Sequence, residues 1–365
     1  MIITKQKEIT RYELSTRVWQ GIPSVAITER GRIFLAFYSG AKTEDYGNYC
    51  AVIKSDDDGK TWSEPVVISD MGGSSRVYDP CVWIDPKGRL WFICAHSPEQ
   101  KVRACICENP DGEVLSWSEE KEIGGEVLLN KPTVMKNGEW WFPSAVWGTG
   151  LMESSPELKE AYRPLDEREI ERKAFTIVTK DGGETFEKRG GALAKEQDRS
   201  FDEHMFLETE RGVEVYLRTH YGIGKSLSND DGFTWSDVED TEWFSPDARF
   251  FIDRLPSGNL LLISHQPSKD PKTPKLRTNL TAFLSDDNGK TWKGKLLLDD
   301  RPFVSYPDGQ VCGEYIYVTY DRDRRGAGEL LLAKFTEEDI LKGELTSEGY
   351  LKKTVIELVR KETEE

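Results

Sequence analysis

The chain alternates between short apolar runs and clusters of turn-forming residues. Runs such as 19–27, 32–38, 80–84 and 90–94 are rich in aromatic and β-branched residues and are five to nine residues long, the length of a β-strand. Turn formers separate them, as at 29–31, and long helical periods are few. The pattern therefore predicts an all-β protein.

One turn pattern recurs in the form Ser/Thr-x-Asp-x-Gly-x-Thr-Trp/Phe. It occurs four times, at residues 55–62, 179–186, 228–235 and 285–292, and each copy follows a short apolar run. A tight hairpin needs these residues, because Asp hydrogen-bonds its neighbouring backbone and Gly accepts a positive φ. The aromatic residue that follows is expected to pack beneath the turn.

The spacing of the copies predicts the number of structural units. A degraded fifth copy lies at 109–112, with Trp117 as its aromatic residue, and successive starts are separated by 54, 70, 49 and 57 residues. Such a period is typical of four-stranded propeller blades with loops of different length. One more blade fits after the last copy. We therefore expect residues 1–365 to form a single domain, a six-bladed β-propeller with hairpins closed by the repeated turn.

Three segments fall outside the repeats. Residues 1–14 are expected to form a strand that closes the ring against the last blade. Residues 152–173 are charged and interrupt the pattern, so we interpret them as a surface insertion, either a solvated loop or a lid. The sequence from Thr336 to Asp339 predicts the start of a short helix that ends near Gly343.

Charge, cysteine content and the N-terminus narrow the class of protein. The formal net charge is −16, so we expect no nucleic-acid or membrane partner, because both need a basic face. No apolar leader or membrane-length run is present, which predicts a cytoplasmic protein, or a secreted one if a signal peptide has been removed. The six cysteines lie mostly in strand-like runs and are expected to be buried thiols. The four histidines lack zinc-ligand spacing, so no metal and no cofactor are expected.

The repeated turn resembles the Asp-box, or BNR repeat, of the sialidase (neuraminidase) superfamily, and the resemblance covers most of the chain. In that superfamily the box turns are structural and lie away from the active site. The resemblance implies a six-bladed propeller that acts as an exo-α-sialidase-like glycosidase on a glycan. The residues that carry the chemistry must therefore be sought outside the boxes.

Four residues match the catalytic pattern of the superfamily in order and approximate spacing. The resemblance implies that Glu203 is the catalytic carboxylate, Arg218 and Arg277 are two members of the arginine cluster, and Tyr306 is the nucleophile of a retaining mechanism. A sialoside carries a carboxylate at its anomeric carbon, so a neutral Tyr activated by Glu avoids the repulsion that a carboxylate nucleophile would meet. Arginine suits the substrate carboxylate because its planar fork binds both oxygens.

The chain departs from the superfamily at the first arginine of the cluster. The superfamily begins with Arg-Ile-Pro, whereas Gly21 precedes Ile22-Pro23 in this chain. Arg17, Arg76 and Arg249 are the candidates to replace the missing arginine, with Arg249 foremost because it stands at the entry to a blade. The specificity for sialic acid depends on such a replacement.

The acid/base residue and the rest of the pocket are less defined. The superfamily places an Asp in the loop before the first box, where this chain offers Glu44 and Asp45. Either carboxyl group can protonate the leaving oxygen if partial burial raises its pKa. The substrate pocket is further expected to include Trp19, Gln20, Arg76, His204 and Arg249, with neighbours in the runs 76–79 and 321–324.

Three other functions remain open. A polysaccharide lyase would use Tyr306 or His204 as its base. An exo-arabinanase-like enzyme would use two carboxylates, Glu203 with Glu44 or Asp45. A non-catalytic glycan-binding propeller would not need the candidate residues to meet in one pocket.

Overall fold

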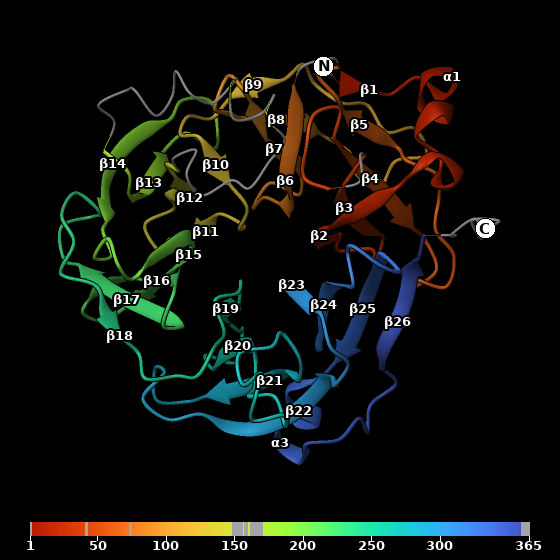
Figure 1. The fold of residues 1–365 in the computed structure, drawn as a ribbon. Helices are drawn as coiled ribbons and strands as arrows, with labels where there is room; N and C mark the ends of the chain where they lie inside the picture. The colour runs from red at the N-terminus through yellow and green to blue at the C-terminus, as the bar shows by residue number, and fades with distance from the viewer. Residues whose placement is uncertain are drawn as a thin grey trace.

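The computed structural model describes residues 2–40, 43–72, 75–147 and 171–358, together with Pro156 and Glu160. The described chain forms six antiparallel sheets that follow one another around a common centre (Figure 1). The prediction of an all-β, six-bladed propeller is confirmed. The predicted insertion at 152–173 lies almost entirely outside the described residues.

Blades one to three contain the N-terminal half of the chain, and their innermost strands are β2 (Trp19–Ile27), β6 (Arg76–Ile84) and, in blade three, the short β10 (Val127–Leu128) and β11 (Thr133–Val134). Blade one consists of β1 (Ile2–Ile3), β2 (Trp19–Ile27), β3 (Ile33–Gly40), β4 (Tyr49–Ser55) and β5 (Val67–Ser69). Blade two consists of β6 (Arg76–Ile84), β7 (Leu90–Ser97), β8 (Lys101–Cys107) and β9 (Lys121–Glu122). Blade three consists of β10 (Val127–Leu128), β11 (Thr133–Val134), β12 (Trp140–Ala145), β13 (Ala174–Thr179) and β14 (Glu187–Ala192).

Blades four to six repeat the same four-stranded meander. Blade four consists of β15 (Arg199–Thr209), β16 (Gly212–Thr219), β17 (Ile223–Ser228) and β18 (Glu239–Asp240). Blade five consists of β19 (Phe251–Arg254), β20 (Leu260–His265), β21 (Leu280–Ser285) and β22 (Lys293–Asp299). Blade six consists of β23 (Val304–Cys312), β24 (Tyr315–Arg322), β25 (Glu329–Phe335) and β26 (Tyr350–Ile356). Among the elements whose bounds lie within the described residues, the α-helices are α1 (Gln6–Ile9) and α3 (Glu337–Lys342), and the 3-10 helices are η1 (Thr10–Tyr12) and η2 (Leu14–Thr16).

The four box turns each connect the third strand of a blade to its fourth. In blade one, Ser55 Oγ donates to Asp57 Oδ1 at 2.8 Å and accepts from the Gly59 N–H at 2.9 Å. Asp57 also accepts from Thr61 through the backbone N–H and the hydroxyl, and these hydrogen bonds lower the pKa of Asp57 to about 2. Asp58 and Gly59 take φ values of 60° and 71°, as the turn requires.

Blades two and six close their outer turns by other means. At the degraded copy, 109–112, Arg32 of blade one donates to two carbonyls of the turn at 2.7 Å. In blade six, α3 stands between β25 and β26. Thr336 and Asp339 form the capping box that begins α3, and Gly343 ends it with a φ of 75°, as predicted.

The ring closes between β2 and β23, so the prediction for residues 1–14 is wrong. Only β1 in that segment is a strand, and it pairs with β5 at the outer edge of blade one before the short helices begin. Between the first and last blades, Asp308 accepts hydrogen bonds from Ser24 Oγ at 2.8 Å and the Val25 N–H at 2.9 Å. Buried polar groups need such partners, and here the partners come from the neighbouring blade.

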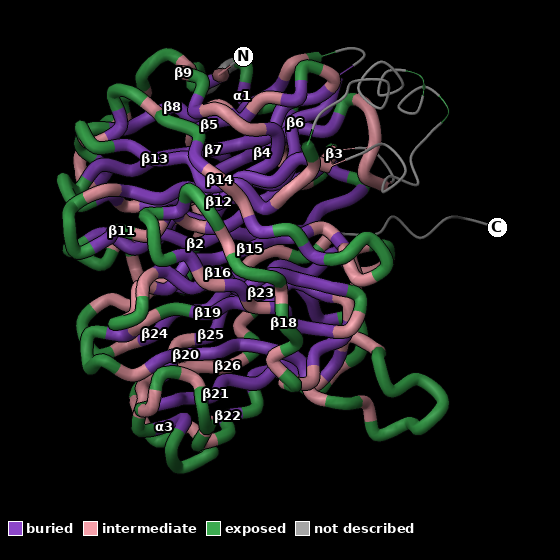
Figure 2. The backbone as a smooth tube through the Cα atoms, turned by 90° about the vertical axis from the view of Figure 1, so that its left-hand side faces the viewer, coloured by how far each residue is buried: buried purple, intermediate pink, exposed green. Residues whose placement is uncertain are grey.

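The apolar core lies within and between neighbouring blades. Trp83, Trp91 and Trp140 of blades two and three pack with ring centroids 5.1 to 6.1 Å apart. Figure 2 shows buried residues along the strands and exposed residues at the connecting turns. All six cysteines are free thiols and all but Cys312 are buried. Among the described helices, none has the length and apolar character needed to cross a membrane.

Candidate active site

Four inner strands share an irregularity near their beginnings. β2, β6, β15 and β23 each contain a shift in register, and at each shift a residue takes a positive φ: Ile22 at 54°, Asp79 at 49°, Glu203 at 40° and Tyr306 at 53°. A β-bulge changes the direction of a side chain, and non-glycine residues in this conformation cluster at functional sites. Three of these four positions carry an ionisable side chain.

Contacts between the inner strands bring the bulges to one level of the propeller. Ser24 Oγ donates to Asp308 at 2.8 Å and accepts from the Val82 N–H at 3.1 Å, which aligns β2 with β6 and β23. Asn130 Nδ2 donates to the Glu203 carbonyl at 2.7 Å. The third strand of each blade runs parallel to the inner strand, so the box turns lie at the opposite end of the channel from the bulges.

Tyr306, Glu203 and Arg218 form a hydrogen-bonded chain across blades four and six. Tyr306 Oη donates to Glu203 Oε1 at 3.2 Å, and Arg218 Nη1 donates to Glu203 Oε2 at 3.0 Å. Arg218 Nε in turn donates to Asp247 Oδ1 at 2.6 Å. Tyr306 is 9% exposed and Glu203 is 5% exposed. The structure thus brings together three residues that the sequence resemblance proposed as partners.

The electrostatic surroundings keep the tyrosine neutral at rest. Burial raises the pKa of the Tyr306 hydroxyl, and the negative charge of Glu203 raises it further, although three arginines oppose the shift. Burial also acts to raise the pKa of Asp247, but the charge of Arg218 and hydrogen bonds from Ser200, Arg218 and His220 outweigh it, so the pKa of Asp247 is lowered. Tyr306 must therefore lose its proton to a base before it can act as a nucleophile.

Arg277 joins this chain through Asp247. Arg277 Nη2 donates to the Asp247 carbonyl at 2.8 Å, and Arg218 Nη2 donates to the same oxygen at 3.1 Å. Arg277 Nη1 donates to Ser305 Oγ at 2.8 Å. Burial lowers the pKa of Arg277, and the nearby charge of Arg218 lowers it further. A bound anion would relieve this repulsion between two buried guanidinium groups.

A third guanidinium group comes from Arg324 and occupies the space above Gly21. A Cβ at position 21 would lie 2.2 Å from Arg324 Cδ and 2.5 Å from its Cγ. The Arg324 guanidinium lies 4.6 Å from the centroid of the Tyr306 ring, and its Nη1 donates to Glu44 Oε1 at 3.2 Å. Asp321 Oδ2 is 3.5 Å from Arg324 Nε and accepts from the Ile22 N–H at 2.7 Å. Arg324 therefore stands where the first arginine of the cluster was expected.

The three arginines proposed to replace that residue have other contacts. Arg249 is fully buried and donates to Asn130 Oδ1 at 2.7 Å and Asp308 Oδ1 at 3.1 Å. These hydrogen bonds hold the segments around the channel together. Arg76 is 1% exposed and lies over the Tyr78 ring at 4.1 Å. Arg17 donates to the carbonyl of Tyr12, in the η1 helix near the N-terminus. No spacing rule in the sequence linked Gly21 to the run 321–324, although that run was expected near the pocket.

The structure does not support a substrate-binding role for Gln20 or His204. Gln20 is fully buried, and its Nε2 donates to the Gly328 carbonyl at 2.7 Å. His204 Nε2 lies 2.9 Å from the Phe175 carbonyl, and burial lowers the pKa of His204 to about 4. Both residues hold neighbouring segments together. Trp19 packs edge-on against Tyr38 with ring centroids 4.8 Å apart, yet it also lines the cavity described below.

Glu44 and Asp45 lie in the loop between β3 and β4, and both are partly exposed. Glu44 faces the cluster, as its contact with Arg324 shows. Asp45 Oδ1 accepts from the Tyr46 N–H at 2.7 Å, which caps the loop itself. Of the two, the structure brings Glu44 to the cluster.

Asp79 is a further carboxyl group of the site. It is 5% exposed. Burial, the negative charge of Glu44 and that of Glu203 raise the pKa of Asp79 to about 8, against the opposing charges of Arg76 and Arg249. The sequence held a signal for it: Asp79 precedes Pro80 as Ile22 precedes Pro23 and Tyr306 precedes Pro307.

A cavity of about 550 Å³ opens beside the three arginines. Residues from blades one, five and six form its walls: Trp19, Thr43, Glu44, Lys275, Leu276, Arg277, Phe303, Ser305, Asp323, Arg324 and Arg325. Cationic side chains outnumber anionic ones here, although the whole chain has a net charge of −16. The cavity is therefore suited to an anionic ligand.

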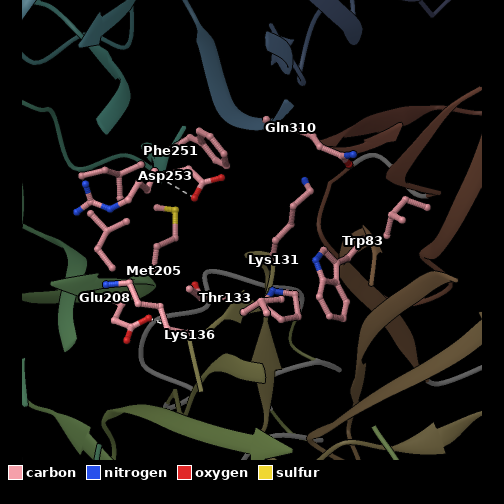
Figure 3. Close-up of a pocket in the computed structure, with 16 residues that line it drawn as sticks. Trp83, Lys131, Thr133, Lys136, Met205, Glu208, Phe251, Asp253 and Gln310 are labelled. Atoms are coloured by element: carbon pink, nitrogen blue, oxygen red, sulfur yellow. Dashed lines mark hydrogen bonds between the residues drawn. The ribbon is translucent and has the colours of Figure 1, made fainter. Parts of the chain in front are cut away.

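A second cavity, of about 430 Å³, lies where the inner strands end (Figure 3). Trp83, Lys131, Asp253 and Gln310 surround it, and Arg218, Arg277 and Arg324 are not among the residues that line it. Lys131 forms an ion pair with Asp308. The other contacts of Asp308, with Ser24 and Arg249, join neighbouring blades at a level between the two cavities. The cavity beside Tyr306 is thus the candidate active site.

Comparisons with known sequences agree with this description. Residues 31–318 match the family described as BNR repeat-like domain. A curated protein named sialidase, from Bacteroides fragilis (strain YCH46), is 24% identical over 312 residues, which are 76% of this chain and 55% of that protein. The chain thus spans about half the length of this relative.

Solved structures share the fold at low sequence identity. A protein of unknown function from Dyadobacter fermentans DSM 18053 has a TM-score of 0.61 at 19% identity and covers 88% of this chain and 94% of its own. The NanB sialidase from Streptococcus pneumoniae has a TM-score of 0.61 at 14% identity over 89% of this chain and 70% of its own. Trypanosoma rangeli sialidase in complex with sialic acid has a TM-score of 0.57 at 15% identity over 84% and 52%.

Proposed function

This chain belongs to the BNR repeat-like domain family, and we propose that it is a sialidase-like glycoside hydrolase that releases a terminal acidic sugar from a glycan. Its sialidase homologues suggest a glycoside hydrolase. The observation that carries the proposal is the chain from Tyr306 through Glu203 to Arg218, beside a cavity that contains Arg277 and Arg324.

The first step transfers the sugar to the protein. Glu203 removes the proton from Tyr306 Oη as this oxygen attacks the anomeric carbon and the bond to the leaving oxygen breaks. Glu203 is already aligned for this transfer, because one of its oxygens accepts from Tyr306 and the other is held by Arg218. The attacking group is neutral at rest, so the carboxylate of an acidic sugar does not repel it.

The arginines supply the binding energy for that carboxylate. Arg277 and Arg324 line the cavity, and their guanidinium carbons lie 5.8 and 4.6 Å from the centroid of the Tyr306 ring. Arg218 adds a third positive charge next to Glu203. Charge-assisted hydrogen bonds from guanidinium to carboxylate are roughly twice as strong as neutral ones. Arg324 thus restores the cluster that Gly21 interrupts.

A carboxyl group must protonate the leaving oxygen, and three candidates surround the site. Glu44 and Asp45 occupy the loop where the superfamily places this acid. Asp79 carries the proton at neutral pH, because its pKa is raised to about 8. In the second step, water attacks the anomeric carbon as the bond to Tyr306 breaks. The same carboxyl group takes the water proton, and Glu203 returns its proton to Tyr306 Oη. The sugar then leaves with retained configuration.

The test is turnover of a fluorogenic α-sialoside, with uronate and arabinofuranoside analogues, by the wild-type protein and Tyr306→Phe. The matched control is Tyr317→Phe, which also removes a buried hydroxyl that donates to a carboxylate, Asp58, at 3.1 Å. Release of the acidic sugar, lost in Tyr306→Phe and kept in Tyr317→Phe, would support the proposal. An ultraviolet-absorbing unsaturated product would indicate a lyase instead, and turnover of the arabinofuranoside alone would contradict the acidic specificity.

A further inference from the structure

The cavity at the ends of the inner strands is separate from the candidate active site. Its walls come from five blades, through β6, β11, β15, β19 and β23. Along β23, Tyr306 belongs to the candidate active site, and Gln310, four residues later, lines this cavity. Asp308 lies between them in buried ion pairs with Lys131 and Arg249. The volume of about 430 Å³ is within the range of ligand sites, roughly 300–1,000 Å³.

Trp83 presents a hydrogen-bond donor to this cavity. The residue is 7% exposed, and edge-on contacts with Trp140 and Phe142 fix its ring, with centroids 5.1 and 6.0 Å away. Figure 3 shows the indole nitrogen directed toward the side chains in the middle of the cavity, with no hydrogen bond to another of the described residues that it draws. A buried indole N–H normally donates to an acceptor, and an oxygen atom of a ligand in the cavity can accept from it.

Asp253 presents an acceptor from another wall. Its Oδ1 accepts from the Arg254 N–H at 2.7 Å, and Figure 3 shows the carboxyl group among the side chains that surround the cavity. Because the cavity lies inside the ring, the surrounding protein removes this group from bulk water and raises the pKa of Asp253 to about 6, although the Arg254 N–H and the charge of Lys131 oppose the shift. Asp253 is therefore largely ionised at pH 7, and a ligand hydroxyl group can donate to its second oxygen.

The remaining lining decides between neutral and charged ligands. Charged side chains of both signs line the cavity: Lys131, Lys136, Arg254, Glu208 and Asp253. A ligand with a net charge of either sign would therefore meet like charges. Met205 and Phe251 add buried apolar surface. A neutral sugar fits this lining, because each hydroxyl group both donates and accepts while the C–H faces of the ring pack on apolar side chains.

We propose that this cavity binds a neutral sugar, with the Trp83 indole N–H and the Asp253 carboxylate as its hydrogen-bonding partners. The inference goes beyond the proposed function and does not depend on it, because no residue of this cavity takes part in cleavage at Tyr306. The protein then holds a sugar without cleaving it at the end of the channel opposite the candidate active site.

The test is a titration of the full chain, nitrogen-labelled at tryptophan and followed through the NMR signals of the indole N–H groups. The signal that is missing in Trp83→Phe identifies Trp83. Glucose, galactose and N-acetylglucosamine are the neutral probes, and glucosamine, glucuronate and serine are the cationic, anionic and zwitterionic ones. Trp117→Phe is the matched control, because Trp117 Nε1 also has no hydrogen-bond partner in the described chain but pairs with Cys107 in blade two, outside the cavity.

At least one neutral sugar is expected to shift the Trp83 signal with saturation below about 50 mM, and Asp253→Ala is expected to weaken this binding about tenfold. Saturation transfer to the sugar should fall in Trp83→Phe and persist in Trp117→Phe. Asp240→Ala should bind as wild type does, since Asp240 Oδ1 also accepts a backbone N–H, from Glu242 at 2.8 Å, but lies on the outer strand of blade four.

Three results would overturn the inference: no saturable shift of the Trp83 signal, equal binding by Asp253→Ala and wild type, or tighter binding of a charged probe than of every neutral sugar. Turnover of the α-sialoside is measured separately. A failure of the sugar site thus leaves the proposed function standing, and a failure of turnover leaves the sugar site standing.

Discussion

Replacing Gly21 by alanine is expected to displace Arg324 without disturbing the backbone. The new Cβ would lie 2.2 Å from Arg324 Cδ, whereas carbon atoms in contact lie about 3.5–4.0 Å apart, so the side chain must move by more than ~1 Å. The φ of Gly21 is outside the left-handed region, so alanine adds no strain there. The guanidinium group, attached directly to Cδ, moves with it and loses its hydrogen-bonding position.

The size of the effect follows from the contact that is lost. A hydrogen bond from a charged group contributes about 1.5–3 kcal/mol, which corresponds to roughly 10- to 150-fold in kcat/KM. The assay is kcat/KM for an acidic sugar with wild type, Gly21→Ala, Arg324→Ala and the double variant. Both single variants should lose activity to a similar extent.

The double variant separates this explanation from others. If Gly21→Ala acts only by displacing Arg324, it has no further effect once Arg324 is removed, and the two losses are strongly non-additive. Additive losses would show that position 21 acts by another route. Wild-type activity in Gly21→Ala would refute the placement of Arg324 in substrate binding.

Three further predictions concern buried carboxyl groups. Glu203→Gln should lower kcat about 10²- to 10⁴-fold with little change in KM, measured by steady-state kinetics, because the base for Tyr306 is lost; wild-type kcat would contradict this role. Asp79 binds a proton in the folded state up to a pKa of about 8 but in the unfolded state only up to about 4, so its contribution to stability falls as pH rises between these values. Asp79→Asn should therefore raise the free energy of unfolding more at pH 8 than at pH 5, and urea denaturation that shows the reverse order would contradict this. Asp308→Ala should cost about 3–5 kcal/mol or more in the same assay, because it leaves the buried charge of Arg249 and the partly buried charge of Lys131 without their shared partner; a cost below about 1 kcal/mol would contradict its role in closing the ring.

Short-range rules explain why the sequence predicted the box turns and α3 correctly. In the box turn, Ser55 and Asp57 form hydrogen bonds with residues only two to four positions away. The residue pattern alone is therefore enough to predict the turn. The Thr336 capping box is equally local. The strand predicted for residues 1–14 failed because ring closure depends on which distant strand offers better partners, and β2 has them in β23.

The candidate site is partly readable from the sequence. Glu203 and Tyr306 were identified by resemblance, and the structure brings them together although they are 103 residues apart. Gln20 and His204 were expected at the pocket because they adjoin the right segments. Their side chains turn instead into the structure, since at a bulge one residue faces the channel and its neighbour faces the blades.

The class of fold, the number of blades and the segments that enter the channel follow from the sequence alone, because strand periodicity and turn chemistry act between near neighbours. Which charged side chains share the site depends on the three-dimensional structure. Arg324 reaches the cluster because a glycine in another blade leaves room for its side chain, and Asp79 keeps its proton because burial and two neighbouring carboxylates disfavour its charge. Steric fit and electrostatic coupling depend on distance in space. Residues far apart in the chain come close to one another only when the ring closes.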